Sequence, residues 1–230
     1  NIANVNTTGY KSSRAEFQEL LYEQERAGGN PNQQGNAPPL GVEIGAGVKT
    51  AATQRDFTQG TLQQTGNDLD ISIEGGGFFP VRAADGTPAF TRAGAFKIDA
   101  TGQLVTTDGL LLDPPIQIPE GTTRVSITRE GRVSVMVGDQ EEPFELGTLE
   151  LATFTNPAGL RAMGRGLFAA TQASGPAIRA LPGQDGVGEL AQGFLESSNV
   201  EVTEEMIDMI VAQRAYEVNQ KVIEAADEML

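Results

Sequence analysis

Residues 70–81 read Asp-Ile-Ser-Ile-Glu-Gly-Gly-Gly-Phe-Phe-Pro-Val, and they carry the clearest fold signal in the chain. Polar and apolar side chains alternate over 70–73, as they do in a strand that is buried on one face. The three glycines interrupt the alternation and apolar side chains resume after them, which is typical of two strands separated by a turn or bulge. A phosphate-binding loop would need a helix and a lysine at the glycines, and this stretch has neither.

The same pattern of short strands and turns extends over residues 42–155. Turn dipeptides separate the predicted strands at roughly every 8 to 20 residues, a spacing typical of antiparallel β structure. They include Asp85-Gly86, Thr101-Gly102, Asp108-Gly109 and Glu130-Gly131. We expect Phe78, Phe79 and Phe90 in the core, because large aromatic side chains in strands are usually buried. The region therefore predicts an antiparallel β domain.

The N-terminal region predicts short helical segments. Ile2 and Val5 lie three residues apart and share a helical face, so residues 1–5 are interpreted as the end of a helix. The sequence Ser-Arg-Ala-Glu at residues 13–16 matches a capping box ahead of an apolar run, which predicts a short helix over 14–24. Because the run is short, an extended segment is the alternative.

Residues 203–230 contain no Gly or Pro and predict one long helix with Thr203 as its N-cap. Apolar side chains recur at helical spacing on two faces of this helix, and two apolar faces need more than one neighbour. We therefore expect an interface with other subunits. The predicted interface residues, which include the N-terminal pair, are Ile2, Val5, Val202, Met206, Ile207, Met209, Ile210, Val211, Tyr216, Val218, Val222 and Ile223.

Composition along the chain predicts four segments and a mainly β protein with helical termini. Residues 1–26 are a helix end and connector. Residues 27–41, rich in Gly, Pro, Asn and Gln, are an insertion loop that cannot bury enough apolar surface to order itself. Residues 42–195 are the β-rich central domain, and residues 196–230 carry the C-terminal assembly helix.

The overall composition excludes several classes of protein. Lys and Arg number 16 and Asp and Glu number 31, a net charge of −15, which argues against a nucleic-acid partner because phosphates need a basic face. The chain has no Cys and no His, so disulfides, thiol catalysis and most zinc and haem sites are excluded. No apolar run approaches the ~20 residues of a membrane-spanning helix, so we expect no membrane insertion.

Asp68 and Asp70 have a spacing that suits catalysis or Ca²⁺ binding, because residues two apart on a strand share a face. We interpret them as a solvated strand entry instead, and the sequence has no EF-hand spacing. A carboxylate-dependent periplasmic hydrolase needs two acids in a cleft, and no pair is marked out for that role. A β-rich binding module is another alternative, but it would not need a helix with two apolar faces. We expect no catalytic, cofactor-binding or metal-binding residues.

Several motifs resemble those of bacterial flagellar rod and hook proteins. Residues 1–11, Asn-Ile-Ala-Asn-Val-Asn-Thr-Thr-Gly-Tyr-Lys, resemble the N-terminal signature of that family, and residues 67–79 resemble its central β signature. Residues 193–200 and 213–219 resemble its C-terminal signature, and the matches run in order along nearly the whole chain. The last of these motifs and the insertion at 27–41 resemble the distal rod branch of the family, with proximal rod or hook subunits as alternatives.

This resemblance implies a structural subunit and not an enzyme. It implies a hollow helical tube in which the terminal helices form a coiled-coil inner layer and the β domain faces outward. The tube would lie in the flagellar basal body, where it would span the periplasm to the outer membrane. It would transmit torque from the motor to the hook. The implied partners are other copies of the chain, other rod proteins and the hook protein along the axis, and peptidoglycan-ring and outer-membrane-ring proteins around it. The resemblance also implies that the chain is exported through the flagellar type III apparatus. It implies no cofactor.

Overall fold

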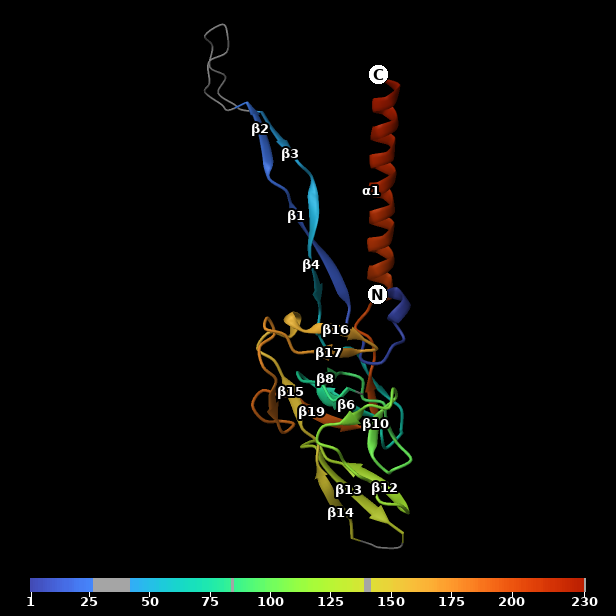
Figure 1. Ribbon diagram of the computed structural model, residues 1–230. Helices are drawn as coiled ribbons and strands as arrows, with labels where there is room; N and C mark the ends of the chain where they lie inside the picture. Colours follow the sequence, from blue (N-terminus) through green and yellow to red (C-terminus); the bar gives the residue numbers. More distant parts are fainter. Residues whose placement is uncertain (27–41, 84, 139–141, 230) are drawn as a thin grey trace. The chain divides into compact units, whose positions relative to one another are not determined.

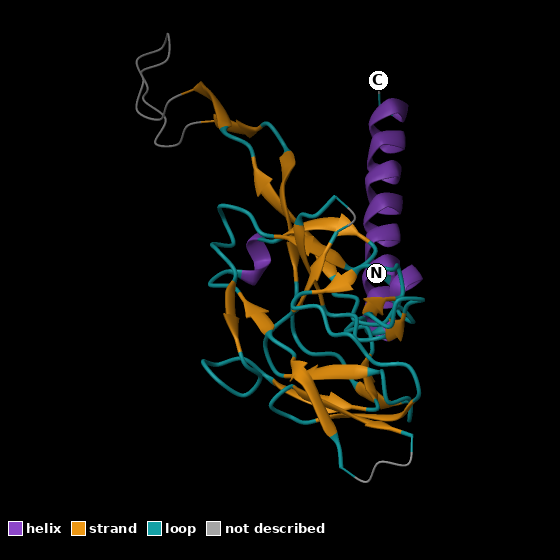
Figure 2. Ribbon diagram, turned by 60° about the horizontal axis from the view of Figure 1, so that its bottom comes forward, coloured by secondary structure: helices purple, strands orange, loops and turns teal. Residues whose placement is uncertain are grey.

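The computed structural model describes residues 1–26, 42–83, 85–138 and 142–229 (Figure 1). Most of the regular structure is β-strand, and one long helix, α1, follows the strands (Figure 2). The chain divides into two compact units: Ser13–Asp56 is one, and Asn1–Ser12 together with Phe57–Leu230 is the other. The prediction of a mainly β protein with a C-terminal helix is therefore confirmed.

The smaller unit is an antiparallel ribbon of two successive strand pairs. β1 (Ser13–Glu19) pairs with β4 (Val48–Arg55), and β2 (Tyr22–Arg26) pairs with β3 (Val42–Gly45). The predicted insertion loop, residues 27–41, comes between β2 and β3 in the sequence and lies outside the described residues. A two-stranded ribbon has no second layer to bury its side chains, so it is marginally stable without a neighbour.

The helix predicted over 14–24 is wrong. Ser13 and Glu16, interpreted as a capping box, are strand residues that pair with residues of β4. A short apolar run does not distinguish helix from strand by its periodicity, and here a distant segment supplies strand partners for residues 13–19. The helix end predicted at residues 1–5 is only a single 3-10 turn, η1 (Ile2–Asn4).

The larger unit is built on a seven-stranded sheet in which every neighbouring pair is antiparallel. Its strand order is β16 (Arg161–Gly164), β17 (Leu167–Ala169), β8 (Pro88–Thr91), β7 (Phe79–Arg82), β11 (Leu111–Leu112), β10 (Leu104–Thr106) and β9 (Phe96–Ile98). A three-stranded sheet has the order β12 (Thr122–Ile127), β13 (Arg132–Val137) and β14 (Phe144–Thr148). The predicted antiparallel β structure is confirmed.

Three antiparallel strand pairs and a 3-10 turn, η2 (Pro157–Gly159), complete the larger unit. The pairs are β15 (Leu151–Thr153) with β18 (Ile178–Ala180), β19 (Glu189–Gln192) with β6 (Ile71–Glu74), and β20 (Phe194–Glu196) with β5 (Leu62–Gln64). We call residues 57–196 the β domain. The last strand of the β domain, β20, is followed by residues 197–201 and then by α1. We call this short connection the root of α1.

Two apolar clusters form the core of the β domain. The larger one includes Phe79 and Ile71, and the smaller one includes Phe78 and Phe90. In the smaller cluster, the rings of Phe78 and Phe90 meet the ring of Phe154 edge to face, at centroid distances of 5.7 and 4.8 Å. This geometry is favourable for aromatic pairs beyond the area that they bury. The three phenylalanines predicted in the core are all buried, so that prediction is confirmed.

α1 spans Val202–Glu228, close to the predicted 203–230, and has no buried residue. Its N-cap is Glu201, so the N-cap predicted at Thr203 is wrong. Glu204 and Glu205 lie in the first turn, where the helix dipole favours negative charge. None of the helices in the described ranges is long and apolar enough to cross a membrane.

Candidate assembly site

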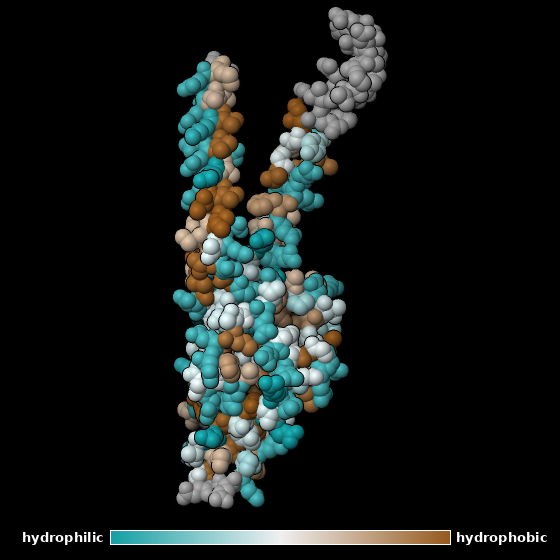
Figure 3. Space-filling model, turned by 180° about the vertical axis from the view of Figure 1, so that it is seen from behind, coloured by the Kyte–Doolittle hydropathy of each residue, from teal (hydrophilic) through white to brown (hydrophobic). Residues whose placement is uncertain are grey.

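The apolar side chains of α1 are exposed. The helical residues predicted as interface are each between 39% and 71% exposed; they are Val202, Met206, Ile207, Met209, Ile210, Val211, Tyr216, Val218, Val222 and Ile223. Figure 3 shows apolar side chains along much of the length of this helix. A helix on the surface of a soluble protein normally buries its large apolar residues on at least one face. α1 therefore presents apolar surface that the described chain does not cover.

One part of this surface is hollowed. Met209, Ala212, Gln213, Tyr216 and Glu217 line a shallow depression of about 380 Å³ on α1. The aromatic ring and the thioether make the depression mainly apolar, and a large apolar side chain of a neighbouring helix would fit such a place.

The two predicted N-terminal interface residues lie at η1. Ile2 is 38% exposed and Val5 is half-buried. The segment is tied to the start of α1, because Asn1 Nδ2 donates to Glu205 Oε1 at 2.6 Å. The hydroxyl of Tyr10 donates to Asn1 Oδ1 at 3.3 Å, which holds the first residue from the other side. The structure therefore brings the N-terminal residues to the first turn of α1, but it does not pack them along the helix.

Next to this point lies a buried cluster of three charges, Lys11, Arg92 and Glu196, which we call the charged anchor. Lys11 Nζ lies 2.6 Å from Glu196 Oε1, and Arg92 Nε lies 2.9 Å from Glu196 Oε2. The three side chains are 0%, 4% and 1% exposed, respectively. Charges that are buried to this degree are stable only when they are paired and hydrogen-bonded, so the anchor must form as a unit.

Backbone groups complete the coordination of the charged anchor. Lys11 Nζ also donates to the Thr58 carbonyl oxygen at 2.6 Å, and the Gly60 amide donates to Glu196 Oε1 at 2.9 Å. Arg92 Nη1 donates to the carbonyl oxygens of Gly75 and Gly77 at 2.9 and 2.7 Å. The triple-glycine stretch that broke the strand pattern therefore holds a guanidinium.

Gly9 allows the N-terminal segment to reach the anchor. Its φ is +67°, a backbone conformation that L side chains rarely adopt. A Cβ at this position would lie 2.7 Å from the carbonyl carbon of Arg92, closer than real Cβ contacts. The Gly9 amide donates to the Glu196 carbonyl oxygen at 2.8 Å, so the two segments meet through their backbones as well as through their charges.

The electrostatics of Glu196 follow from two opposing effects. Burial alone would raise the pKa of this carboxyl group, but the charge and hydrogen bonds of Arg92 and Lys11 outweigh it and hold the pKa below its usual value of 4.5. Glu196 is therefore ionised at neutral pH. Arg92 Nη2 is buried without a hydrogen-bond partner among the described residues, so the second cation depends strongly on the Glu196 charge.

The ribbon of the smaller unit carries a further apolar surface that the sequence did not predict. Phe17, Leu21, Tyr22, Ile44 and Val48 are all more than half exposed. Leu21 and Tyr22 line a depression of about 690 Å³ on this ribbon. This surface was missed because the region was predicted as a helix. The alternation of polar and apolar residues over Arg14–Gln18 was the available signal for a strand.

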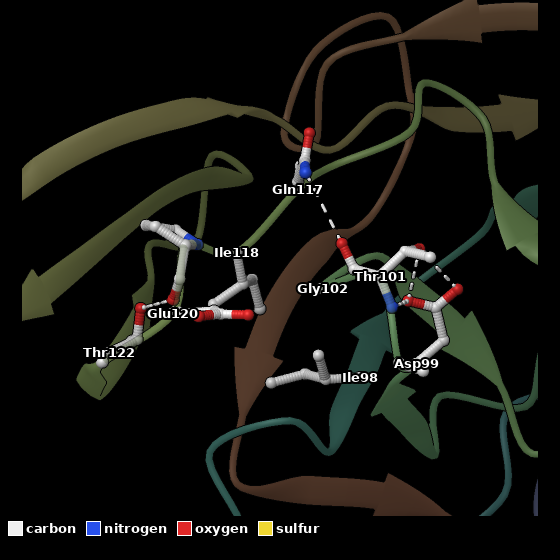
Figure 4. Close-up of a pocket in the computed structure, with 11 residues that line it drawn as sticks. Ile98, Asp99, Thr101, Gly102, Gln117, Ile118, Glu120 and Thr122 are labelled. Carbon is white, nitrogen blue, oxygen red and sulfur yellow. Dashed lines mark hydrogen bonds between the residues drawn. The ribbon is translucent and has the colours of Figure 1, made fainter.

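The carboxylate of Asp99, which lies at a pocket of the β domain, is engaged in a turn. Ile98, Asp99, Thr101, Gln117 and Glu120 are among the residues that line a polar pocket of about 430 Å³ (Figure 4). The Asp99 carboxylate is turned back onto its own turn, where a backbone hydrogen bond from Gln103 is the main cause of its lowered pKa. It therefore stabilises a turn and is poorly suited to donate a proton.

The structure does not bring Asp68 and Asp70, which were interpreted from the sequence as a strand entry and not as a site, together on a strand face. Asp68 is exposed in a turn, whereas Asp70 is buried and accepts hydrogen bonds from Thr65 Oγ1 at 2.6 Å and Asn67 Nδ2 at 3.0 Å. Asp70 thus stabilises the loop before β6. Within residues 1–26, 42–83, 85–138 and 142–229, no group of three or more acidic side chains is placed to hold a metal ion.

Known proteins of one kind resemble this chain. The family model described as the flagellar hook protein FlgE/F/G D1 domain matches residues 72–135, and the flagellar basal body rod FlgEFG protein C-terminal model matches residues 191–230. Over the whole chain and 88% of each relative, the chain is 50% identical to the flagellar basal-body rod protein FlgG of Borreliella burgdorferi and 48% identical to that of Agrobacterium fabrum. It is 30% identical to the flagellar hook-basal body complex protein FlhP of Bacillus subtilis, with the same coverage.

Proposed function

The chain belongs to the family of flagellar basal-body rod proteins, as a structural subunit of the distal rod, and from that premise we propose that it polymerises by burying α1 between subunits. The observation that carries the proposal is the helix itself. α1 has no buried residue, although apolar side chains recur along it. Assembly with other copies would give both apolar faces of the helix a neighbour.

The energetics favour assembly over a stable exposed helix. Burying one Val, Ile or Met side chain contributes roughly 1.5 to 3 kcal/mol, and about ten such side chains per subunit are available on α1. In proteins, most of the stability of a helix comes from tertiary packing of an apolar face, and α1 has no such packing within the described chain. In the assembled form, the terminal segments would form a coiled-coil inner layer around a hollow tube, with the β domain facing outward.

The mechanical role follows from such a tube. A helical homopolymer of this chain would act as a drive shaft that transmits torque from motor to hook. It would contact other rod proteins and the hook protein along its axis, and peptidoglycan-ring and outer-membrane-ring proteins around it. The position across the periplasm to the outer membrane, the type III export and the absence of catalytic activity all belong to this proposal.

One substitution tests the proposed role of α1. Ile223→Asp places a charge on an apolar face of the helix without touching the β domain. The substitution should leave the thermal unfolding of the monomer unchanged, but it should prevent polymers from sedimenting, because every subunit would bury one charge at a cost of several kcal/mol. Asn219→Asp, which adds the same charge outside the two apolar series, is the matched control and should polymerise.

Two results would contradict the proposal. A strong fall in the unfolding temperature of the Ile223→Asp monomer would mean that this side chain belongs to an intramolecular core. Normal polymers of Ile223→Asp would mean that this position faces solvent in the assembly.

A further inference from the structure

We propose that the charged anchor is a lock that couples the N-terminal and C-terminal segments to each other, and that it sets the directions in which both leave the β domain. This inference rests on the proposed polymerisation for its functional meaning. Lys11 comes from the N-terminal segment, Glu196 from the end of β20, and Arg92 from the turn after β8. Each of three distant parts of the chain thus contributes one charge to the same buried point.

The charges make the docking of the two segments mutual. Without the N-terminal segment, Glu196 and Arg92 would keep one ion pair but lose the Lys11 contacts to Oε1 and to the Thr58 carbonyl oxygen. Without the segment that carries Glu196, Lys11 and Arg92 would be two buried cations without an anion. Because a buried charge without a counter-charge is unstable, the N-terminal segment cannot dock fully without Glu196, and Glu196 in turn loses one of its two cations without the N-terminal segment.

Backbone contacts on either side of the anchor extend the coupling toward α1. The Ser12 amide donates to Asn199 Oδ1 at 2.7 Å, and the Ser197 amide donates to the Thr61 carbonyl oxygen at 2.9 Å. Asn1 then contacts Glu205, in the first turn of the helix. The coupling therefore runs without a break from the β domain through the anchor to the root of α1.

The contacts before α1 matter because the helix has no buried residue of its own. Among the described residues, what fixes the root of α1 is this short region and not packing along the helix. In a polymer, the same region would have to carry force between the inner helices and the β domain. A loosened anchor should therefore change the geometry of the polymer, and not only the stability of the subunit.

The first arm of the test measures hydrogen exchange in the full-length monomer. Lys11→Gln should speed exchange at least tenfold in residues 9–12 and also in residues 196–199, which it does not replace, while the amides of β7 and β13 stay protected. Lys11→Arg, which keeps the charge, should restore slow exchange in both segments. Arg129→Gln breaks the exposed Arg129–Glu189 pair, at 73% and 49% exposure, and should change neither segment.

A milder variant covers the case in which Lys11→Gln does not fold. Asn199→Ala removes the acceptor of the Ser12 amide and the Asn199 Nδ2 hydrogen bonds to Thr58, and it leaves all three charges in place. It should also speed exchange in both segments, to a smaller extent. Faster exchange confined to the segment that carries the substitution, in either variant, would overturn the lock.

The second arm examines polymers by electron microscopy. Lys11→Gln should give polymers with altered helical symmetry or none, whereas Lys11→Arg should reproduce the wild-type symmetry. Wild-type symmetry in the Lys11→Gln polymers would overturn the directing role of the anchor. If the wild-type chain forms no polymer, the proposed function fails instead, and the exchange result still decides whether the two segments are coupled.

Discussion

Glu196 is the residue at which the N-terminal segment, the β domain and the approach to α1 meet. Its two carboxylate oxygens accept from Lys11, Arg92 and the Gly60 amide, at 2.6 to 2.9 Å. Removing one partner from a buried charge cluster costs more than the cluster contributes as a whole, because the remaining charges stay buried without compensation. Stability should therefore respond sharply to the charge of this one side chain.

Glu196→Gln tests this response with almost no change in shape. The substitution leaves Lys11 and Arg92 buried without an anion, so the free energy of unfolding should fall by about 3 to 5 kcal/mol at pH 7. Urea unfolding of the monomer measures it. Glu189→Gln breaks an exposed pair instead and should cost less than about 1 kcal/mol. Equal, small losses in the two variants would show that the anchor contributes little to stability.

The lowered pKa of Glu196 predicts a pH dependence with a definite sign. Below the usual pKa of 4.5, Glu196 is protonated in the unfolded state but still ionised in the folded state. The stabilisation that the ionised Glu196 gives the folded state is therefore complete above this pH. It is lost as the pH falls through the lower pKa of the folded state. The stability difference between the wild type and Glu196→Gln should therefore be constant near neutrality and shrink in acid. Denaturant unfolding across this range measures it.

Comparison with Glu196→Gln also removes the contributions of other acids. Asp85, Asp99 and Glu130 have lowered pKa values, mainly because of hydrogen bonds, and these groups should titrate alike in both proteins. A difference that grows as the pH falls would contradict the assignment.

The anchor could not have been predicted from local sequence. The Lys11–Glu196 pair joins residues 185 positions apart, and the Arg92–Glu196 pair joins residues 104 positions apart. Separations of this size follow from no local sequence pattern. The glycines whose carbonyl oxygens accept from Arg92 predicted only a turn or bulge. Only the resemblance of residues 1–11 and 193–200 to family signatures marked these segments as important.

At the scale of elements, the sequence predicted what local periodicity determines. α1 was predicted to within one residue at its start, because 27 residues without Gly or Pro at helical spacing leave little ambiguity. The strands around 70–81 followed from alternation and turn residues. The ribbon strands β1 and β2 were missed, because their structure depends on partners in β4 and β3 that lie far along the chain.

Residues 27–41, which lie outside the described residues, carry a prediction at the same scale. Their composition cannot supply a core, so we propose that they contribute contacts between neighbouring subunits and stiffen the tube. Their amide exchange should be fast in the monomer and slow on assembly. Residues 99–103, a turn within the β domain, provide an internal reference that should change little. Equal exchange of 27–41 in both states would remove the stiffening role.

At the scale of the whole molecule, the chain combines a well-packed β domain with surfaces that it does not cover. The β domain has two buried apolar clusters and several sheets of antiparallel strands. α1 and the ribbon expose large apolar side chains that a monomer of this size would normally bury. Such a combination of a packed domain and exposed apolar surfaces is expected for a subunit of a polymer, because the apolar surfaces become buried only when the subunit contacts other copies.

The most direct test of this account is amide hydrogen exchange of α1 before and after assembly of the wild-type chain. We predict fast exchange along residues 206–223 in the monomer, because an unpacked helix lacks the tertiary packing that supplies most helical stability, and exchange at least a hundredfold slower in the polymer. The amides of β7 and β13 should be protected in both states and serve as the reference. Equal exchange of α1 in monomer and polymer would contradict the claim that this helix is the surface by which the rod assembles.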